Sequence, residues 1–413
     1  METSDSMHQT QVDITILGGG IAGLWLLNRL RYEGYHAILL EAHKLGSAQT
    51  IASQGMIHGG IKYALSGALT GASQAIAEMP QHWRNCLAGH GDVDLRQAKI
   101  LSEFFYLWSS DSLGSKMKTF FASKATRGRV HSVEKANYPA VFQHPLFSGN
   151  IYQLQDIVLD VPSVVKALAD NYQPWIYKFD WSASRFTHRS DGSIENLIAV
   201  QGEQQIQIQS KAFIFSAGEG NEAILKQLNI TQPQMQRRPL KQVMVKHQNK
   251  YWLYAHCMGS DADASPRLTI SSHAWDENSI VWYLGGQLAT DNLNSTDEQL
   301  IVKAQQELNL LFPWMDFCKA EWRVYSIDRA EPKQRALLRP EKAFVSLCQG
   351  QQNLFTAWPT KLTLAPNLAN ETLALLRQQN ILPGNILPRD AAKKLTLPQP
   401  DIAATVWSEA FNR

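Results

Sequence analysis

The sequence predicts an α/β fold with two domains, a Rossmann-like nucleotide-binding domain and an α+β domain whose segments are inserted into it. Three observations support this expectation. A strand–glycine–helix–strand unit opens the chain, a buried strand ending in small residues lies mid-chain at 211–221, and strand-like segments fill 236–291. With 413 residues, the chain is also too long for one ordinary hydrophobic core.

The opening unit is the most informative stretch, "VDITILGGGIAGLWLLNRLRYEGYHAILLEA". Val12–Leu17 is a β-rich apolar run that predicts a buried parallel strand. Gly18, Gly20 and Gly23 then form G-x-G-x-x-G, and leucines at helical spacing continue from them. A second strand is expected over 37–40, so the unit has the order of a dinucleotide-binding crossover.

Physical chemistry explains each position of this motif. The first glycine lets the chain turn, the second lets a pyrophosphate approach bare backbone, and the third packs the helix against the strand. The partial positive charge at the helix N-terminus then faces the phosphates. Glu41, 18 residues beyond Gly23, is expected to accept hydrogen bonds from a ribose diol. Residues 42–80 contain no immediate second βαβ unit, unlike nicotinamide dehydrogenases, so FAD is favoured over NAD.

Composition excludes several other classes of protein. A formal charge of +2 argues against nucleic-acid binding, and the longest apolar run, Ile14–Leu27, is too short to span a bilayer. The polar start "METSDSMHQTQVD" has no signal-peptide pattern. Four widely spaced cysteines without histidines at ligand spacing predict reduced, buried thiols in a cytoplasmic protein and no metal site.

The rest of the chain gives weaker signals of secondary structure. A helix is expected from Asp160, another from Ser295, which has Glu298 in capping-box spacing, and a last one over 365–379. Strands are expected around the turn "SDGS", in "KQVMVKH", "KYWLYAH", "PRLTIS" and "IVWYLGGQLATD", and in "KAFVSLC" and "NLFTAW". The tail from 380 holds four prolines, so we expect it to wrap or extend rather than to form a core.

Four segments, in order, resemble the flavin-dependent oxidoreductase superfamily that includes D-amino-acid oxidase, glycine oxidase and FAD-dependent glycerol-3-phosphate dehydrogenase. They are "ILGGGIAGLWLLNRL…LLEA", "FIFSAGEGN", "WYLGGQLATD" and "TAWPTKLTLAP". The resemblance implies a Rossmann-like FAD-binding domain of the glutathione-reductase type, interleaved with an α+β substrate domain built on an antiparallel or mixed sheet. The implied division is 10–80, 150–235 and 330–378 for the FAD domain, 81–149 and 236–329 for the substrate domain, and 379–413 for a tail.

Within this superfamily, "IHGGIKY" at 57–63 and "KLT" at 361–363 look closest to the glycerol-3-phosphate dehydrogenase branch. L-2-hydroxyglutarate oxidases also carry an I-H-x-G string at this place. The chain departs from that branch at Lys62, where arginine is usual, and at Pro359 and Thr360, which replace a glycine pair. The segment "IDRAEP" matches the branch only loosely, so membership of the superfamily is better supported than glycerol 3-phosphate as substrate.

The resemblance also implies which residues contact FAD and substrate. The expected FAD contacts are Gly18, Gly20, Ile21, Ala22, Gly23, Glu41, Ala42, Ser53, Gly55, Ala217, Gly218, Thr360, Lys361, Leu362 and Thr363. The expected catalytic residues are His58, Lys62, Tyr63, Arg329 and Lys361. His58 is a candidate proton acceptor, with a hydrogen bond to the flavin edge or a covalent flavin link as alternatives. Arg329 could clamp an anionic group, and Lys361 could stabilise reduced flavin.

We therefore expect an FAD-dependent oxidoreductase that oxidises a small anionic hydroxy compound by hydride transfer to flavin N5. A quinone, another acceptor or dioxygen would receive the electrons. Three alternatives stay open: an amine or amino-acid oxidase, a non-catalytic flavin-binding protein, and an RNA-modifying flavoenzyme, which the near-neutral charge disfavours. The basic stretch 116–129 suggests either weak contact with anionic lipid at the inner membrane face or a solvated loop. No pattern indicates the oligomeric state.

Overall fold

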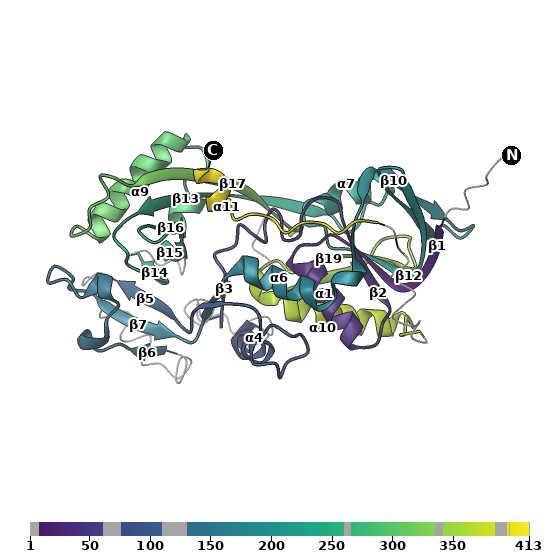
Figure 1. Cartoon of the computed structure of the whole chain (residues 1–413), viewed down its shortest axis with the longest axis horizontal. Coiled ribbons are helices and arrows are strands. Elements are labelled where there is room, and N and C mark those ends of the chain that lie inside the picture. The colour runs from purple at the N-terminus through teal and green to yellow at the C-terminus, as the bar shows by residue number, and fades with distance from the viewer. Residues whose placement is uncertain are drawn as a thin grey trace.

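A computed structural model describes residues 8–60, 76–109, 130–259, 266–334, 342–384, 395 and 397–412. The described strands form two eight-stranded sheets and a three-stranded sheet. The two large sheets lie towards opposite ends of an elongated molecule, with helices α1, α6 and α10 packed beside the first (Figure 1). Mixed α/β architecture with multi-stranded sheets confirms the predicted fold class.

The first sheet is built around β1 (His8–Leu17), whose last six residues are all buried. β1 pairs in parallel with β2 (Ala37–Glu41) on one side and β12 (Gln204–Phe215) on the other. These continuous apolar runs form central parallel strands because helices cover the sheet. The remaining strands are β9 (Ile176–Lys178), β10 (Asp180–His188), β11 (Ile194–Gln201), β18 (Phe344–Leu347) and β19 (Leu354–Trp358).

Helix α1 (Ile21–Tyr32) lies between α6 (Val161–Asn171) and α10 (Ala365–Gln378) (Figure 1). It is buried along most of its length because it packs against the sheet and both helices. Asp160 caps α6 as predicted, since its side chain accepts a hydrogen bond from the Ser163 N–H. Two further helices are α4 (Met79–Leu87) and α7 (Gly220–Gln227).

The second sheet is mixed, with antiparallel pairs except for the parallel pair of β5 and β14. Its longest pair, β13 (Met235–His247) and β17 (Glu321–Pro332), runs from beneath α9 (Asp297–Leu311) to the region of α7 (Figure 1). This pair brings the second sheet to the edge of the first sheet. The other strands are β5 (Phe105–Ser109), β6 (Val130–Ser132), β7 (Asn150–Leu154), β14 (Ala255–Met258), β15 (Pro266–Ala274) and β16 (Ile280–Gly285).

The small sheet joins three segments that are distant in sequence: β3 (Met56–Ile57), β8 (Ile157–Leu159) and β4 (Ile100–Ser102). β3 and β8 are antiparallel, with Ile57 opposite Ile157. The residue that follows β3 therefore lies beside the residue that precedes β8. These two residues are His58 and Asp156.

Four local expectations were wrong. Helix α9 is capped by Thr296 and Gln299, one residue beyond the predicted Ser295 and Glu298, because Thr296 and Gln299 make both reciprocal capping bonds. Only the last residues of "KYWLYAH" are in β14, and α8 (Gln287–Thr290) follows β16 directly. All four cysteines are free, but Cys318 is exposed rather than buried.

Among the described residues, none of the helices has the length and apolar composition that a membrane span requires.

The C-terminal tail wraps across the molecule, but the prediction that it forms no core was wrong (Figure 1). Ile402 bridges to Leu45, and α11 (Val406–Phe411) places Trp407 and Phe411 in the main hydrophobic cluster. In the described part of the tail, Leu395, Leu397 and Val406 are buried as well, because apolar side chains gain by covering the hydrophobic surface.

His273, in β15, is buried beneath the tail. Its ring stacks on Trp407 with ring centroids 3.9 Å apart, and burial lowers the pKa of His273 to about 3. An unfolded histidine has a pKa of about 6.5, so the unfolded chain binds the extra proton first as pH falls. We expect the free energy of unfolding to drop as pH falls from 6.5 towards 3.

The contribution of His273 to this decrease in the free energy of unfolding can be measured by urea unfolding at several pH values between 7.5 and 5. The His273→Phe variant, which cannot take up this proton, should lose less stability over that range than the wild type. His90→Phe, at an exposed histidine, is the control and should follow the wild type. Equal pH dependence of H273F and the wild type would contradict this prediction.

Candidate functional site

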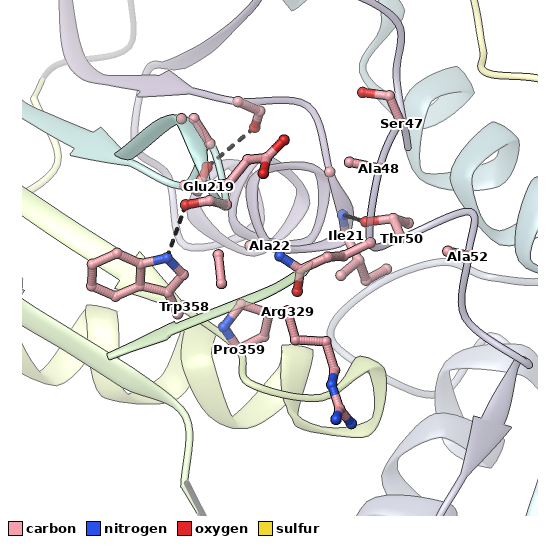
Figure 2. Close-up of a pocket in the computed structure, with 18 of the residues that line it drawn as sticks. Ile21, Ala22, Ser47, Ala48, Thr50, Ala52, Glu219, Arg329, Trp358 and Pro359 are labelled. Atoms are coloured by element: carbon pink, nitrogen blue, oxygen red, sulfur yellow. Dashed lines mark hydrogen bonds between the residues drawn. The ribbon is translucent and has the colours of Figure 1, made fainter. Parts of the chain in front are cut away.

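A cavity of about 500 Å³ lies between the two large sheets. Its walls come from the start of α1, the loop after β2, the end of β12, the β13–β17 pair and the segment after β19. Figure 2 shows side chains from these segments converging on it, among them Ile21, Thr50, Arg329 and Trp358. Most of the residues predicted to contact cofactor or substrate line this one cavity.

At one end, Gly18, Gly20, Ile21 and Ala22 line the cavity where α1 begins. Gly20 is the N-cap and offers no side chain, so backbone N–H groups of the first turn face outwards. The Ile21 N–H donates to the Thr50 hydroxyl at 3.0 Å (Figure 2). Gly18 has a φ of +111°, and a Cβ there would lie 2.6 Å from Ala217. The sequence folds into a bare-backbone cradle of the kind that binds phosphate.

Glu41 lies beside this cradle, at the end of β2. Its carboxylate accepts hydrogen bonds from the Gly19 N–H at 2.5 Å and the His43 N–H at 2.7 Å. The side chain is buried but lines the cavity together with Ala42. Two backbone donors thus hold the carboxylate in place, and its remaining lone pairs can accept hydrogen bonds from a ligand.

Two predicted cofactor residues, Gly23 and Gly55, are not among the described residues that line the cavity. A Cβ on Gly23 would lie 1.8 Å from the Gly18 carbonyl oxygen, and one on Gly55 would lie 2.0 Å from the Leu159 carbonyl oxygen. Both glycines therefore permit close packing behind the cavity wall. Ser53, also predicted, does line the cavity.

His58 lines the opposite part of the cavity, and its side chain is 25% exposed. Its backbone N–H donates to the Thr363 hydroxyl at 3.0 Å, which joins β3 to the segment after β19. Its ring Nδ1 lies 3.4 Å from Asp156 Oδ2, and the ring stacks on His256 with centroids 6.0 Å apart. An imidazole at a cavity wall with a carboxylate behind it is a typical arrangement for proton transfer.

Three cationic side chains also line the cavity: Arg329, Lys361 and Arg238. Arg238 makes a bidentate pair with the buried Glu331, with N–O distances of 3.0 and 2.5 Å. Arg329 lies opposite Arg238 in the β13–β17 register, and its Nε donates to the Arg238 carbonyl at 3.5 Å. Glu331 offsets the charge of Arg238, and Arg329 and Lys361 bring two further cationic side chains to the cavity.

The segment after β19 forms the remaining wall. The Trp358 indole N–H donates to the Gly218 carbonyl at 3.0 Å, and Ala217, Gly218 and residues 360–363 line the cavity (Figure 2). Thr360 has a φ of +63°. A β-branched residue in this region is strained by roughly 1–2 kcal/mol. Its hydroxyl donates to the Lys342 carbonyl at 3.0 Å, which helps to hold this conformation.

Sequence reasoning missed several residues of the site. Their only common feature is position in the folded chain: they are Thr50, Gln54, Phe179, Trp181, Glu219, Arg238 and Gln242. Gln54 donates to the Tyr283 carbonyl at 2.7 Å, and the Tyr283 hydroxyl donates to Gln242 at 2.7 Å. Glu219 lies in the segment "FIFSAGEGN", where its neighbours Ala217 and Gly218 were predicted; the others lie in none of the four segments that carry the resemblance. Lys62 and Tyr63, and the basic stretch 116–129, lie outside the described residues.

The sequence model of the DAO family, described as FAD dependent oxidoreductase, matches residues 13–246. The chain is 43% identical over 400 residues to the probable FAD-dependent oxidoreductase PA4991 of Pseudomonas aeruginosa. The aligned region covers 97% of this chain and 98% of that protein. The chain belongs to the FAD dependent oxidoreductase (DAO) family. It is thus an FAD-dependent oxidoreductase, and the resemblance to the D-amino-acid oxidase superfamily is confirmed.

Solved structures agree with this assignment. The crystal structure of PA4991 matches the oxidoreductase with a TM-score of 0.82 at 38% identity, over 98% of this chain and 99% of that chain. Glycine oxidase from Geobacillus kaustophilus matches with a TM-score of 0.62 at 13% identity, over 94% and 98% of the two chains. FAD-bound L-alpha-glycerophosphate oxidase from Mycoplasma pneumoniae gives 0.63 at 14% identity, over 89% and 95%. The last two share the fold.

The residues of this cavity fit FAD. The glycines at the start of α1 form a cradle that any Cβ would fill, as at Gly18, and the Glu41 carboxylate lies next to it. These groups would hold the diphosphate and the adenosine ribose, respectively. The segment 357–363 and His58 line the part of the cavity away from this cradle.

Proposed function

We propose that the oxidoreductase oxidises a small anionic hydroxy compound, a hydroxy acid or a polyol phosphate. FAD, when bound, supplies the acceptor for the hydride that leaves the substrate carbon. The observation that carries the proposal is His58 in the cavity wall with Asp156 behind it. A hydroxyl is a very weak acid, so its proton needs a base when the carbon is oxidised. An amine, with a pKa of about 10, can lose its proton to solvent before the reaction.

The cationic side chains in the cavity support the second part of the proposal. Arg329 and Lys361 line the same cavity as His58, and a guanidinium can bind a carboxylate or phosphate in a bidentate way. In this proposal, Arg329 and Lys361 hold the anionic group of the substrate while His58 accepts the hydroxyl proton. Electrons then leave to a quinone, another small acceptor or dioxygen.

We also infer the domain roles and the compartment. The strands of the first sheet come from residues 8–41, 176–215 and 344–358, which supports an FAD domain of 10–80, 150–235 and 330–378. The second sheet supports a substrate domain of 81–149 and 236–329, with 379–413 as a tail. Four free cysteines support a reducing compartment, and so the cytoplasm.

Anaerobic mixing of the FAD-loaded protein with a panel of compounds tests the substrate class. Hydroxy acids and polyol phosphates should bleach the flavin absorbance, and amino acids and amines should leave it unchanged. Bleaching by amino acids alone would overturn the hydroxy-compound proposal. It would favour amine oxidation on the same scaffold, for which the cationic wall could bind the amino-acid carboxylate equally well.

The role of Arg329 gives a separate prediction. Arg329→Met removes a charged hydrogen-bond donor of the kind worth about 1.5–3 kcal/mol, so KM for an anionic substrate should rise roughly 10- to 100-fold. FAD content should stay close to that of the wild type. Steady-state kinetics with substrates that carry and lack the anionic group would check this. Arg96→Met, at an exposed arginine, is the matched control, and a KM for R329M equal to that of this control would contradict the prediction.

A further inference from the structure

A second cavity, of about 300 Å³, lies behind His58. It is lined by Gly59, Ala77, Pro80, Gln81, Arg84, Gln155 and Asp156. His58 lines the first cavity and Asp156 lines the second, so this pair of side chains forms part of the wall between them.

The backbone places the pair in register. Ile57 and Ile157 are opposite each other in the β3–β8 ladder, so His58 and Asp156 follow as the next pair although 98 residues separate them in sequence. Asp156 is 4% exposed. Its Oδ1 accepts from the Gly59 N–H at 2.8 Å, which orients Oδ2 towards His58 Nδ1 at 3.4 Å. That distance is long for a hydrogen bond, but catalytic contacts in ligand-free sites are often long.

We propose that Asp156 positions His58 and conducts the substrate hydroxyl proton into the second cavity. This inference rests on the proposed function. The substrate O–H bond breaks as an N–H bond forms at His58 Nε2, on the side of the ring away from Asp156. The Nδ1 proton passes to Asp156 Oδ2 and then to water, while the hydride of the same two-electron oxidation goes to FAD. The proton thus leaves on the opposite side from the substrate.

Two features support an exit at this place. Gln81, Arg84 and Gln155 give the second cavity polar walls, and a polar cavity of this size holds water. Arg84 is engaged elsewhere, because it bonds the Glu103 carboxylate at 2.6 Å and backbone carbonyls of Glu103 and Gln155. Its charge is therefore partly offset, because its described ion pair is with Glu103 rather than with Asp156.

Several groups influence the protonation of His58 in addition to Asp156. His256 stacks on its ring and hydrogen-bonds to the Thr269 hydroxyl at 2.7 Å. Lys361, Arg329 and Arg238 line the same cavity and favour the neutral imidazole. The Asp156 carboxylate lies against the His58 ring, and its negative charge favours the protonated imidazole. Removing this charge should therefore lower the pKa of His58.

The first test compares the wild type with Asp156→Asn and Asp156→Glu. The pKa of His58 is measured by NMR of histidine-labelled protein, assigned with a His58→Gln variant. We expect D156N to lower this pKa by about 1 unit or more. The rate of anaerobic flavin reduction should fall at least about 10-fold, its pH profile should move to lower pH, and KM should change little. D156E should recover part of both effects, and Asp170→Asn, at an exposed carboxylate, should change neither.

The second test addresses the exit itself. Ala77→Phe should fill the second cavity without touching His58. The pKa of His58 and the single-turnover reduction rate should stay within about 2-fold of the wild type, while kcat falls and added imidazole buffer restores it. Gln81→Leu, which makes the cavity less polar, replaces A77F if that variant loses FAD.

The outcomes separate this inference from the proposed function. An unchanged His58 pKa and pH profile in FAD-loaded D156N would overturn the role of Asp156, even if hydroxy acids reduce the flavin. A wild-type kcat in the filled-cavity variant would overturn the exit route. If only amino acids reduce the flavin, the proposed function fails, while the NMR result still shows whether Asp156 controls His58.

Discussion

Replacing His58 by glutamine should slow substrate-driven flavin reduction by about 100-fold or more, because a general base commonly contributes a factor of 10²–10⁴. Glutamine keeps a hydrogen-bonding group of similar length but cannot accept a proton. The backbone bond from residue 58 to the Thr363 hydroxyl remains, so the local chain should keep its course. Stopped-flow absorbance under anaerobic conditions, with the best substrate of the panel, measures the effect.

Two controls make this result specific to proton transfer. FAD content and reduction by dithionite should match the wild type, which shows that the cofactor is bound and accessible. His256→Gln changes the neighbouring ring, which stacks on His58 but is not among the described residues that line the first cavity, and should have a much smaller effect. A normal reduction rate in H58Q would show that the substrate needs no base at this position.

Replacing Gly23 by alanine should destabilise the protein by at least about 3 kcal/mol and abolish retention of FAD. A Cβ at this position would lie 1.8 Å from the Gly18 carbonyl oxygen and 2.8 Å from the Ser216 hydroxyl. Gly18 follows β1 and Ser216 follows β12, and these strands are parallel neighbours in the sheet, so neither residue can move away easily and α1 must shift outwards. That shift would displace the N-terminal turn of α1, which in our proposal holds the FAD diphosphate.

Urea unfolding and flavin released on denaturation measure the two effects of G23A. Gly259→Ala is the matched control, because a Cβ there meets only ordinary contacts, the nearest at 3.5 Å. A G23A protein that keeps wild-type stability and a full complement of FAD would mean that α1 and β1 do not cross as closely as described.

The chain's local patterns were enough to define the cofactor half of the site. β1, the glycines, α1 and β2 are neighbours in sequence, and each is stabilised by short-range hydrogen bonds or by an apolar period that a sequence displays directly. Glu41 could be recognised for the same reason, since the crossover sets its distance from the glycines. The helix after Asp160 was equally predictable, because the capping side chain acts three residues away.

The partners of the polar groups in the site could be identified only from the folded chain. Arg238 pairs with Glu331 across 93 residues, and His58 meets Asp156 across 98. Such pairs arise from strand register, which depends on how distant apolar faces pack, and no local period encodes it. The capping of α9 moved by one residue for a related reason: Ser295 and Thr296 are both acceptable caps, and the surrounding structure chose between them. Local chemistry thus specified the glycine cradle and the Glu41 carboxylate, and long-range packing specified which polar groups complete the cavity.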